Sequence, residues 1–426
     1  MKGREKVAAL LSQSEVEVSS KLMGKGPTWM AGTTGRIVYW RPGLAIPLRQ
    51  GESRVIIVQL NGEESLRVGV HKLPMNSPND VSALERLIDK GEVNPAEIVA
   101  LIGKTEGNGG ANDFTRGFAT LSYALALAKR LGVAPEEVQK RVAFVWSGGT
   151  EGVLSPHATL FTRAASEKSG EKRLAFGVAV TRDFAPEEIG TLAEVREVAA
   201  AVKRAQAEAG ISDPKDVHYV QVKGPLLTPA AVADADRRQA KLVTRDPNGS
   251  KPFARGATAL GVALALGEVK ESDLSEAVIA RRMDLYSSVA NTSAGGELKN
   301  CEILLFGNSG TAGGDLRIGH AILSDVVDAN AVRAAARDAI GDPKAPIEPE
   351  RIVAIFAKAE AAPNGMVRGR RTTMLSDADI NYERHARAAL GAVITSVTGD
   401  AAIFVSGGTE HQCKPGEAPI AAIVRV

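Results

Sequence analysis

Three lysines and three serines recur at matching places in this sequence, and each lysine–serine pair could form an activated nucleophile. Each lysine interrupts or ends an apolar run of a kind typical of buried strands: "LIGKTEG", "VQVKGP" and "IFAKAE" contain Lys104, Lys223 and Lys358. Each serine ends another strand-like run: Ser147, Ser309 and Ser406. Burial disfavours an ammonium and lowers the pKa of a lysine. The neutral amine could then take the proton of a neighbouring serine hydroxyl.

A glycine follows each of these serines, at Gly148, Gly310 and Gly407. A Ser-Gly pair where a strand enters a turn exposes the hydroxyl and leaves backbone N–H groups free to hold a developing oxyanion. For a single pair, the alternative is a lysine that extends to solvent and a Ser-Gly that only forms a turn. The threefold repetition of the same pairing favours the catalytic interpretation.

An arginine near the start of a helix accompanies each pair. The stretches "NDFTRGFA", "KPFARGATA" and "ERHARAA" supply Arg116, Arg255 and either Arg384 or Arg387. A guanidinium can donate two parallel hydrogen bonds to a ligand oxygen, although a single such arginine is more typically a solvated helix residue. Grouped around one axis, the three sets would form a ring of donors suited to a small, flat ligand with carbonyl and ring N–H groups.

The order of the expected elements explains this recurrence. From about residue 66 the chain repeats strand, helix, strand, helix, and strand into a glycine turn three times. We predict an α+β fold in which three homologous α/β units pack with pseudo-threefold symmetry around one central active site. The expected boundaries are 64–168 (unit A), 169–317 (unit B) and 318–426 (unit C). Residues 1–63, which are broken by Gly and Pro, are expected to be an N-terminal extension of unknown role.

Composition excludes several classes of function. The 52 basic and 50 acidic residues give a net charge of +2, which provides no field for nucleic acid or an anionic membrane. No apolar run is long enough for a membrane span. Two cysteines indicate no disulfide framework, so we expect a cytoplasmic protein. The six histidines lack the helical two-histidine spacing of zinc enzymes, so no catalytic zinc is expected.

Long stretches between about Leu66 and Val426 resemble the ring-opening cyclic amide hydrolases, the family of cyanuric acid amidohydrolase and barbiturase. They include "GKTEGNGGANDFTRGFA", "VAFVWSGGTEGVLSPH", "VHYVQVKGPLLTP", "VRGRRTTMLSDADIN" and "VSGGTEHQ". The resemblance implies three repeats around a pseudo-threefold axis and ring-opening hydrolysis of a cyclic amide. It favours cyanuric acid, opened to carboxybiuret and biuret, as the substrate. The alternatives are barbiturate, another cyclic amide, or a non-catalytic protein that binds cyclic imides.

The resemblance also implies a role for individual residues. It makes Ser309 the nucleophile of an acyl-enzyme mechanism and Lys223 its base. It favours Arg387 over Arg384. The substrate-binding residues it implies, together with those of the repeated pattern, are Lys104, Arg116, Ser147, Gly148, Arg255, Ser309, Gly310, Lys358, Arg387, Ser406 and Gly407.

The chemistry is expected to need no cofactor, but the resemblance implies a structural Mg²⁺ or Ca²⁺. Its carboxylate ligand would be Glu360. The remaining ligands would be main-chain carbonyls of the C-terminal loop "TEHQCKPGEAP", at Thr409, Gln412, Cys413, Lys414 and Glu417. The resemblance also implies a homotetramer.

Overall fold

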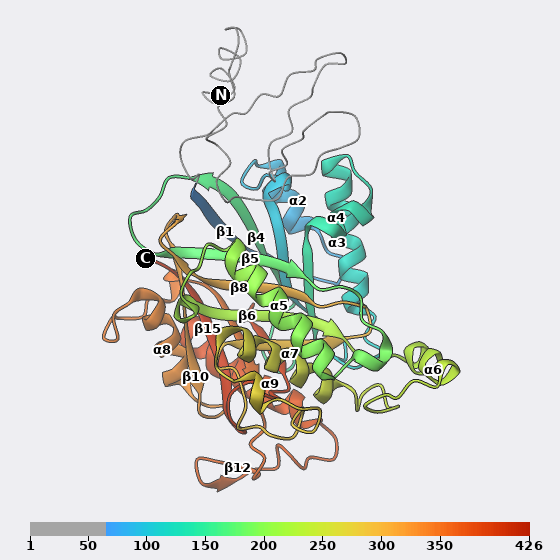
Figure 1. Ribbon diagram of the computed structural model, residues 1–426. Coiled ribbons are helices and arrows are strands. Elements are labelled where there is room, and N and C mark those ends of the chain that lie inside the picture. The colour runs from blue at the N-terminus through green and yellow to red at the C-terminus, as the bar shows by residue number, and fades with distance from the viewer. Residues whose placement is uncertain (1–64) are drawn as a thin grey trace, which may run out of the picture. The chain divides into compact units, whose positions relative to one another are not determined.

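The structure, a computed structural model, describes residues 65–426 (Figure 1). The predicted N-terminal extension, residues 1–63, lies outside the described residues. In the described part, mixed α/β structure is built on a five-stranded sheet in the order β3-β2-β4-β1-β9 and two four-stranded sheets, β5-β8-β6-β7 and β10-β15-β11-β14. A small hairpin pairs β12 (Met366–Val367) with β13 (Arg370–Arg371).

The three units share the order strand, helix, strand, helix, strand, strand, and units A and B each have one further helix between the second and third strands. Unit A contains β1 (Ser65–Pro74), α2 (Ser82–Asp89), β2 (Ile98–Thr105), α3 (Thr115–Leu131), α4 (Pro135–Arg141), β3 (Ala143–Gly148) and β4 (His157–Ser166). Unit B contains β5 (Arg173–Val180), α5 (Leu192–Glu208), β6 (Val217–Pro225), α6 (Pro229–Arg238), α7 (Lys251–Leu266), β7 (Ala290–Gly295) and β8 (Glu302–Ser309). After β9 (Ala312–Gly313), unit C contains β10 (Leu316–Leu323), α8 (Ala329–Ile340), β11 (Ile352–Ala359), α9 (Tyr382–Thr398), β14 (Phe404–Gly407) and β15 (Ala418–Arg425).

Strand pairing is also the same in the three units. In each, the first strand runs antiparallel to the fourth, the fourth antiparallel to the second, and the second parallel to the third. The parallel pair needs a crossover, which the second helix supplies. Because β10 begins at Leu316, the third sheet starts two residues before the boundary that the sequence predicted.

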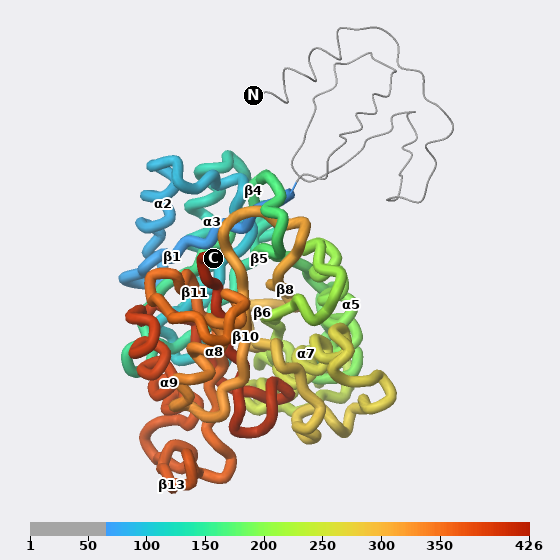
Figure 2. Tube along the Cα trace, turned by 90° about the vertical axis from the view of Figure 1, so that its left-hand side faces the viewer, coloured from blue at the N-terminus to red at the C-terminus, as the bar shows by residue number. Residues whose placement is uncertain are grey.

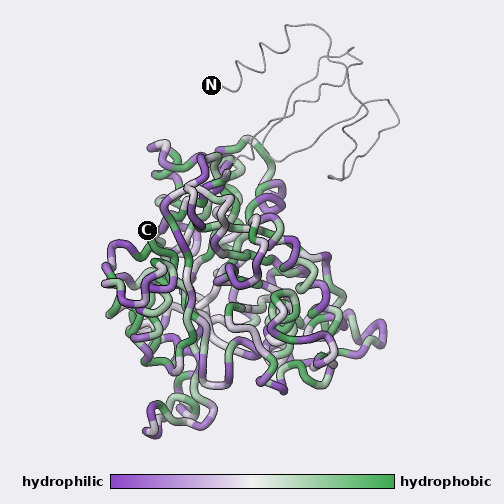
Figure 3. Tube along the Cα trace, turned by 60° about the vertical axis from the view of Figure 1, so that its left-hand side comes forward, coloured by the Kyte–Doolittle hydropathy of each residue, from purple (hydrophilic) through white to green (hydrophobic). Residues whose placement is uncertain are grey.

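Helices cover one face of each sheet, and the other faces share a core. In α8, buried residues recur at helical spacing, at Ala331, Val332, Ala335, Ala336 and Ala339, so one side of the helix packs on its sheet. Figure 3 shows hydrophobic and hydrophilic residues alternating along the outer helices, and Figure 1 shows α5 and α7 side by side over the strands of unit B.

The shared core is rich in aromatic rings from all three units. Phe161 of β4, Phe306 of β8 and Phe356 of β11 belong to one buried cluster, and the Phe176 and Phe306 ring centroids are 4.4 Å apart. Figure 2 shows the blue, green-to-yellow and orange-to-red parts of the chain in separate regions that meet in the middle. The three units therefore hold each other through a common apolar centre. No helix among residues 65–426 is both long and apolar enough to cross a membrane.

Candidate active site

The three lysines lie at equivalent places, at the end of the second strand of each unit. Successive side chains of a strand point to opposite faces of the sheet. In β2, β6 and β11 the lysine therefore lies on the same face as Ile102, Tyr219 and Phe356 of the shared core. All three are almost fully buried: Lys104, Lys223 and Lys358. The same face of the three sheets therefore brings the lysines to the centre of the protein.

The parallel third strand places a serine beside each lysine. Lys104 pairs with Ser147 and Lys358 with Ser406, as the sequence pattern predicted. Lys104 Nζ donates to Ser147 Oγ at 3.1 Å and lies 3.5 Å from the carbonyl oxygen of Gly148. In this unit a buried amine is thus in hydrogen-bond contact with a serine hydroxyl.

Lysines of the other units reach into a neighbouring unit. Lys223 Nζ donates to the Trp146 carbonyl of unit A at 3.2 Å, beside Ser147. Lys358 Nζ donates to the Thr292 carbonyl of unit B at 2.6 Å and to the Gly407 carbonyl at 2.9 Å. The three sets therefore interlock at the centre instead of forming separate sites.

The predicted pairing of Ser309 with Lys223 is wrong. Lys223 pairs with Glu302 at the start of β8, whereas Ser309 ends that strand, seven residues further on and roughly 20 Å away. The odd spacing also turns Ser309 to the opposite face of the sheet. Its hydroxyl donates to the Gly210 carbonyl at 2.7 Å, so Ser309, with Gly310 beyond it, lies outside the ring.

The serine beside Lys223 is Ser293, on β7. The sequence prediction missed it because "ANTSAG" follows a short, partly polar run, whereas the longer apolar run of β8 drew attention to Ser309. A usable signal was present: a glutamate follows each serine of the ring by four residues. The pairs are Ser147 with Glu151, Ser293 with Glu297, and Ser406 with Glu410.

A glycine between serine and glutamate lets the carboxylate fold back beside the strand end. A Cβ atom added at Gly149 would lie 2.4 Å from the Glu151 carboxylate, and one at Gly295 would lie 2.1 Å from that of Glu297. A side chain at either position would have to displace the carboxylate. The glycines of this motif therefore leave room for the carboxylate as well as exposing backbone N–H groups.

The three predicted arginines bind these glutamates, each in the next unit around the ring. The ion pairs, each with two contacts, are Arg116 with Glu297 (2.9 and 3.2 Å), Arg255 with Glu410 (2.8 and 2.8 Å) and Arg387 with Glu151 (2.8 and 2.5 Å). Unit A thus contacts B, B contacts C, and C contacts A. The sequence prediction identified the arginines but not the carboxylates that orient them.

The geometry shows which of Arg384 and Arg387 is the ring arginine of unit C. Arg387 is 5% exposed and ion-paired within the ring. The side chain of Arg384 is 43% exposed, and its guanidinium lies 3.9 Å from Glu151. Arg387 therefore occupies the place equivalent to Arg116 and Arg255.

We expect Arg387→Ala to lower the free energy of unfolding by about 3–5 kcal/mol, because it leaves the Glu151 carboxylate without its main partner in a mostly buried place. The matched change Arg384→Ala should alter it by less than about 0.5 kcal/mol, since that side chain is at the surface. Urea titration of both variants measures the difference. Equal losses would contradict this view of the ring.

Burial lowers the pKa of all three lysines, but the carboxylates around them differ. Burial moves the pKa of Lys104 and Lys358 well below the ordinary lysine value. For Lys223, burial again lowers the pKa, and the Glu297 carboxylate 3.1 Å from Nζ opposes the shift. Burial alone would raise the pKa of Glu297, but Lys223 and Arg116 together lower it to about 2.

Lys223 also faces a second buried carboxyl group across the strands. Glu302 pairs with it in β8, where the equivalent partner of Lys104 is His157. Burial raises the pKa of Glu302 to about 8. The surroundings of the three lysines are therefore chemically unequal, although the backbone repeats.

The residues expected to hold a cation gather after β11 and β14. Glu360 follows β11, and Thr409 Oγ donates to its carboxylate. Burial, together with the nearby Glu410 and Glu383 carboxylates, raises the pKa of Glu360 to about 7 in spite of that hydrogen bond. A divalent cation would relieve this crowding of carboxylates, so the donor chemistry fits.

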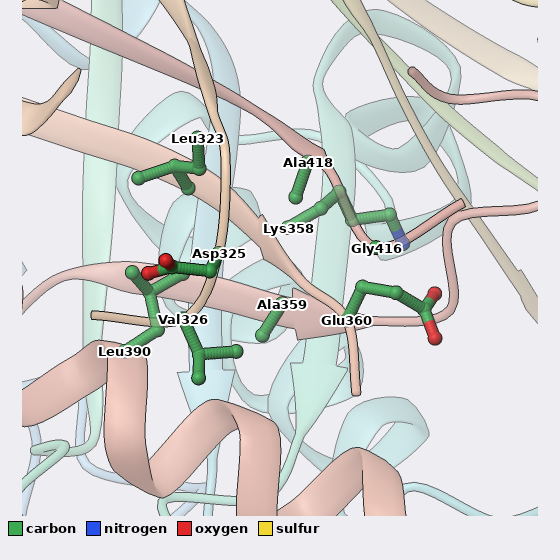
Figure 4. Close-up of a pocket in the computed structure, with 9 residues that line it drawn as sticks. All are labelled: Leu323, Asp325, Val326, Lys358, Ala359, Glu360, Leu390, Gly416 and Ala418. Atoms are coloured by element: carbon green, nitrogen blue, oxygen red, sulfur yellow. The ribbon is translucent and has the colours of Figure 1, made fainter. Parts of the chain in front are cut away.

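The loop that would supply carbonyl ligands is sharply turned, with positive φ at His411 and Cys413. The Gln412 side chain accepts from the Thr292 N–H at 2.7 Å, and the Glu417 carboxylate lies 3.4 Å from the Lys414 N–H, so these side chains stabilise the loop. A small pocket lies nearby, and Figure 4 shows the Glu360 carboxylate turned away from its apolar residues Val326 and Leu390.

Comparison with known proteins identifies the family. Residues 69–425 match the family described as amidohydrolase ring-opening protein. A cyclic amide hydrolase of Azorhizobium caulinodans is 67% identical over 84% of this chain and 100% of its own length. A cyanuric acid amidohydrolase of Enterobacter cloacae is 51% identical over the same shares.

A solved structure of a cyanuric acid hydrolase superimposes with a TM-score of 0.81 at 50% identity, covering 85% of this chain and 100% of that one. A second, from A. caulinodans, gives 0.78 at 45% identity and covers 84% and 99%. Sequence and architecture thus agree over almost all of the described residues. The chain therefore belongs to the family of ring-opening amidohydrolases, which confirms the family and the enzyme class that its sequence predicted.

Proposed function

We propose that this amidohydrolase opens the ring of cyanuric acid, or of a close cyclic imide, at a single site on the pseudo-threefold axis. The observation that carries the proposal is the ring of three lysines, three serines and three arginine–glutamate pairs contributed in turn by the three units. A flat ring with three equivalent carbonyls and three N–H groups matches such donors in number and symmetry. The names of the two relatives given above support the same substrate class.

Ser293 is the nucleophile of this proposal and Lys223 its base. Both face the centre from adjacent parallel strands, β7 and β6. The Ser293 hydroxyl is buried and has no hydrogen-bond partner among residues 65–426, whereas Ser147 is held by Lys104 and Ser406 Oγ lies 3.3 Å from Asn291 Oδ1. An uncommitted hydroxyl can turn toward a substrate carbon at no cost in broken contacts.

The carboxylate beside Lys223 favours it as the base. A general base works best when its pKa lies near the working pH. Burial, with a neighbouring arginine, moves the pKa of Lys104 and Lys358 well below the ordinary lysine value although carboxylates oppose the shift, which weakens them as bases. For Lys223 burial also lowers the pKa, but the Glu297 carboxylate is only 3.1 Å from Nζ and opposes the shift directly. Lys104 and Lys358 then donate to substrate oxygens, and as neutral amines they can accept from ring N–H groups.

The reaction follows from these positions. The Lys223 amine takes the proton of Ser293 as Oγ bonds to a ring carbonyl carbon. Backbone N–H groups of the turn after β7 hold the oxyanion. The ring C–N bond then breaks, and the Lys223 ammonium returns the proton to the departing nitrogen. Water, deprotonated by Lys223, attacks the acyl carbon, and the Lys223 ammonium returns the proton to Ser293 Oγ as the bond to the opened product breaks.

The substrate is tested by assaying the purified full-length chain on cyanurate and barbiturate side by side. Cyanurate has three equivalent carbonyls, whereas barbiturate has a CH₂ in place of one N–H and so lacks a donor on one side. We expect kcat/KM for cyanurate to exceed that for barbiturate by at least about tenfold, the value of one lost hydrogen bond to a buried partner. A preference for barbiturate would reject cyanurate as the substrate, and tight binding of both rings without ring opening would reject the hydrolase itself.

The proposal includes a structural Mg²⁺ or Ca²⁺ held by Glu360 and by the main-chain carbonyls of Thr409, Gln412, Cys413, Lys414 and Glu417. An ion there would balance the carboxylates next to the ring without entering the chemistry. Elemental analysis of the purified protein should find about one such ion per chain. Glu360→Gln should lose it, and equal metal content in both proteins would reject the site.

A further inference from the structure

Two histidines that are far apart in the sequence, and that belong to different units, are in contact in the structure. His218 lies near the start of β6 in unit B and His320 on β10 in unit C, and their Nδ1 atoms are 2.9 Å apart. Asp338 of α8 brings a carboxylate oxygen to 3.2 Å from the first Nδ1 and 3.8 Å from the second. The three donor atoms lie within 4.8 Å of one another. Two imidazoles and a carboxylate so close together form a recognisable set of metal ligands.

The repeats show that the fold does not need these imidazoles. The pairing register of β6 shifts at His218, between Val217 and Tyr219, and β2 and β11 have a register shift at the same place. His320 follows a core residue, Ile318, by two positions. At the equivalent places the other units have valines packed on the shared core: Val99 and Val353 for His218, and Val70 and Val178 for His320. Both members of one pair are therefore histidine where the other units are apolar.

The carboxylate of Asp338, in contrast, has a counterpart in unit B. Asp338 accepts the backbone N–H of His320 at 2.9 Å, and Glu208 accepts that of Val178 in unit B at 2.6 Å. Glu208 is paired with the guanidinium of Arg163 at 2.8 Å. In unit C the corresponding carboxylate instead faces the two imidazoles. The local charge is thus left for something other than an arginine to balance.

We propose that His218, His320 and Asp338 bind a divalent transition-metal ion of the Zn²⁺ type, which links unit B to unit C. Zn–N bonds of about 2.0–2.1 Å in a tetrahedral site place ligand atoms about 3.3 Å apart. The observed separations of 2.9, 3.2 and 3.8 Å bracket that value. Asp338 is 44% exposed on its side chain, so water can supply the fourth ligand.

The protonation state suits such an ion. Burial, with His218 nearby, lowers the pKa of His320 to about 4, so this imidazole is neutral at physiological pH. Without an ion, one Nδ1–H must donate to the other Nδ1; with an ion, both rings carry their proton on Nε2 and offer Nδ1 lone pairs. Imidazole nitrogen also selects Zn²⁺ over the hard cations Mg²⁺ and Ca²⁺. The site is therefore chemically distinct from the Glu360 site.

The test is calorimetric titration of the full-length chain with Zn²⁺ in excess Mg²⁺, which keeps the Glu360 site occupied. We expect one Zn²⁺ per chain and a rise of roughly 2 °C or more in the melting temperature at saturation. His218→Val and His320→Val insert the residue of the equivalent units, so they should fold. Each should weaken Zn²⁺ binding at least about tenfold and abolish the thermal shift.

A matched control is His385→Ala. Asp377 lies 3.2 Å from His385, and no second imidazole accompanies this pair among residues 65–426, so the loss of His385 should leave Zn²⁺ binding unchanged. Residues 1–64 contain no histidine or cysteine that could substitute as ligands. If the two valine variants bind Zn²⁺ as tightly as the unaltered chain, or if the unaltered chain binds none, the pair is a hydrogen-bonded contact only and the proposal fails.

Discussion

Replacing Ser293 by alanine should lower kcat by roughly 10³-fold or more while the protein stays folded, because the reacting oxygen is gone. The side chain is small, and its hydroxyl is without a partner among the described residues, so the change breaks no contact. Steady-state ring opening, followed with circular dichroism on the same sample, measures both effects. Mass spectrometry of rapidly quenched reactions should also find an acyl adduct on Ser293 in the unaltered enzyme.

Three matched variants locate the nucleophile. Ser309→Ala should keep kcat within about threefold, since that hydroxyl bonds Gly210 outside the ring. Ser147→Ala and Ser406→Ala should act mainly through KM, each removing one donor to a substrate oxygen, worth about 0.5–1.5 kcal/mol. If Ser147→Ala were the inactive variant and Ser293→Ala the active one, Lys104 and Ser147 would be the catalytic pair.

Lys223→Ala should reduce kcat/KM by about 10²- to 10⁴-fold, the usual contribution of a general base. In the unaltered enzyme only the neutral amine can take a proton, so activity should rise with pH as Lys223 deprotonates. Burial lowers that pKa, so the rising limb should lie below the ordinary lysine value of about 10.4. A pH–rate profile of kcat/KM measures the limb.

The carboxylate beside Lys223 provides a sharper test of the same assignment. Glu297 opposes the effect of burial, so Glu297→Gln should lower the pKa of Lys223 further and move the rising limb to lower pH. Glu151→Gln removes the corresponding carboxylate from another set and should leave the limb where it was. A limb that moves equally in both variants, or in neither, would show that another group is the base.

The sequence predicted the repeated units and most of the ring because the same local pattern recurs. Apolar runs ending in lysine, and serine followed by glycine, are visible without a fold, and they predicted the observed strand pairing of Lys104 with Ser147 and of Lys358 with Ser406. The pattern failed at Ser293, whose strand owes its place to pairing with β6 and not to a long apolar run of its own. Hydrophobicity identified the wrong strand of unit B.

Contacts between units lay beyond sequence reasoning. The glutamates follow the serines at constant spacing, but nothing local indicates that each would meet an arginine of the next unit. His218 and His320 are 102 residues apart, so a search for ligands on one helix could not find them. Such residues are brought together only by the packing of three sheets on one core.

The arginine–glutamate pairs close on themselves, A to B, B to C and C back to A. A chain with any one unit detached would leave a guanidinium at one broken junction and a carboxylate at the other without the partner that contacts it twice. Separation of one unit therefore costs free energy twice, once for each of the two ion pairs that it breaks. We expect the catalytic centre to exist all at once or not at all, with no functional intermediate made of two thirds of the molecule.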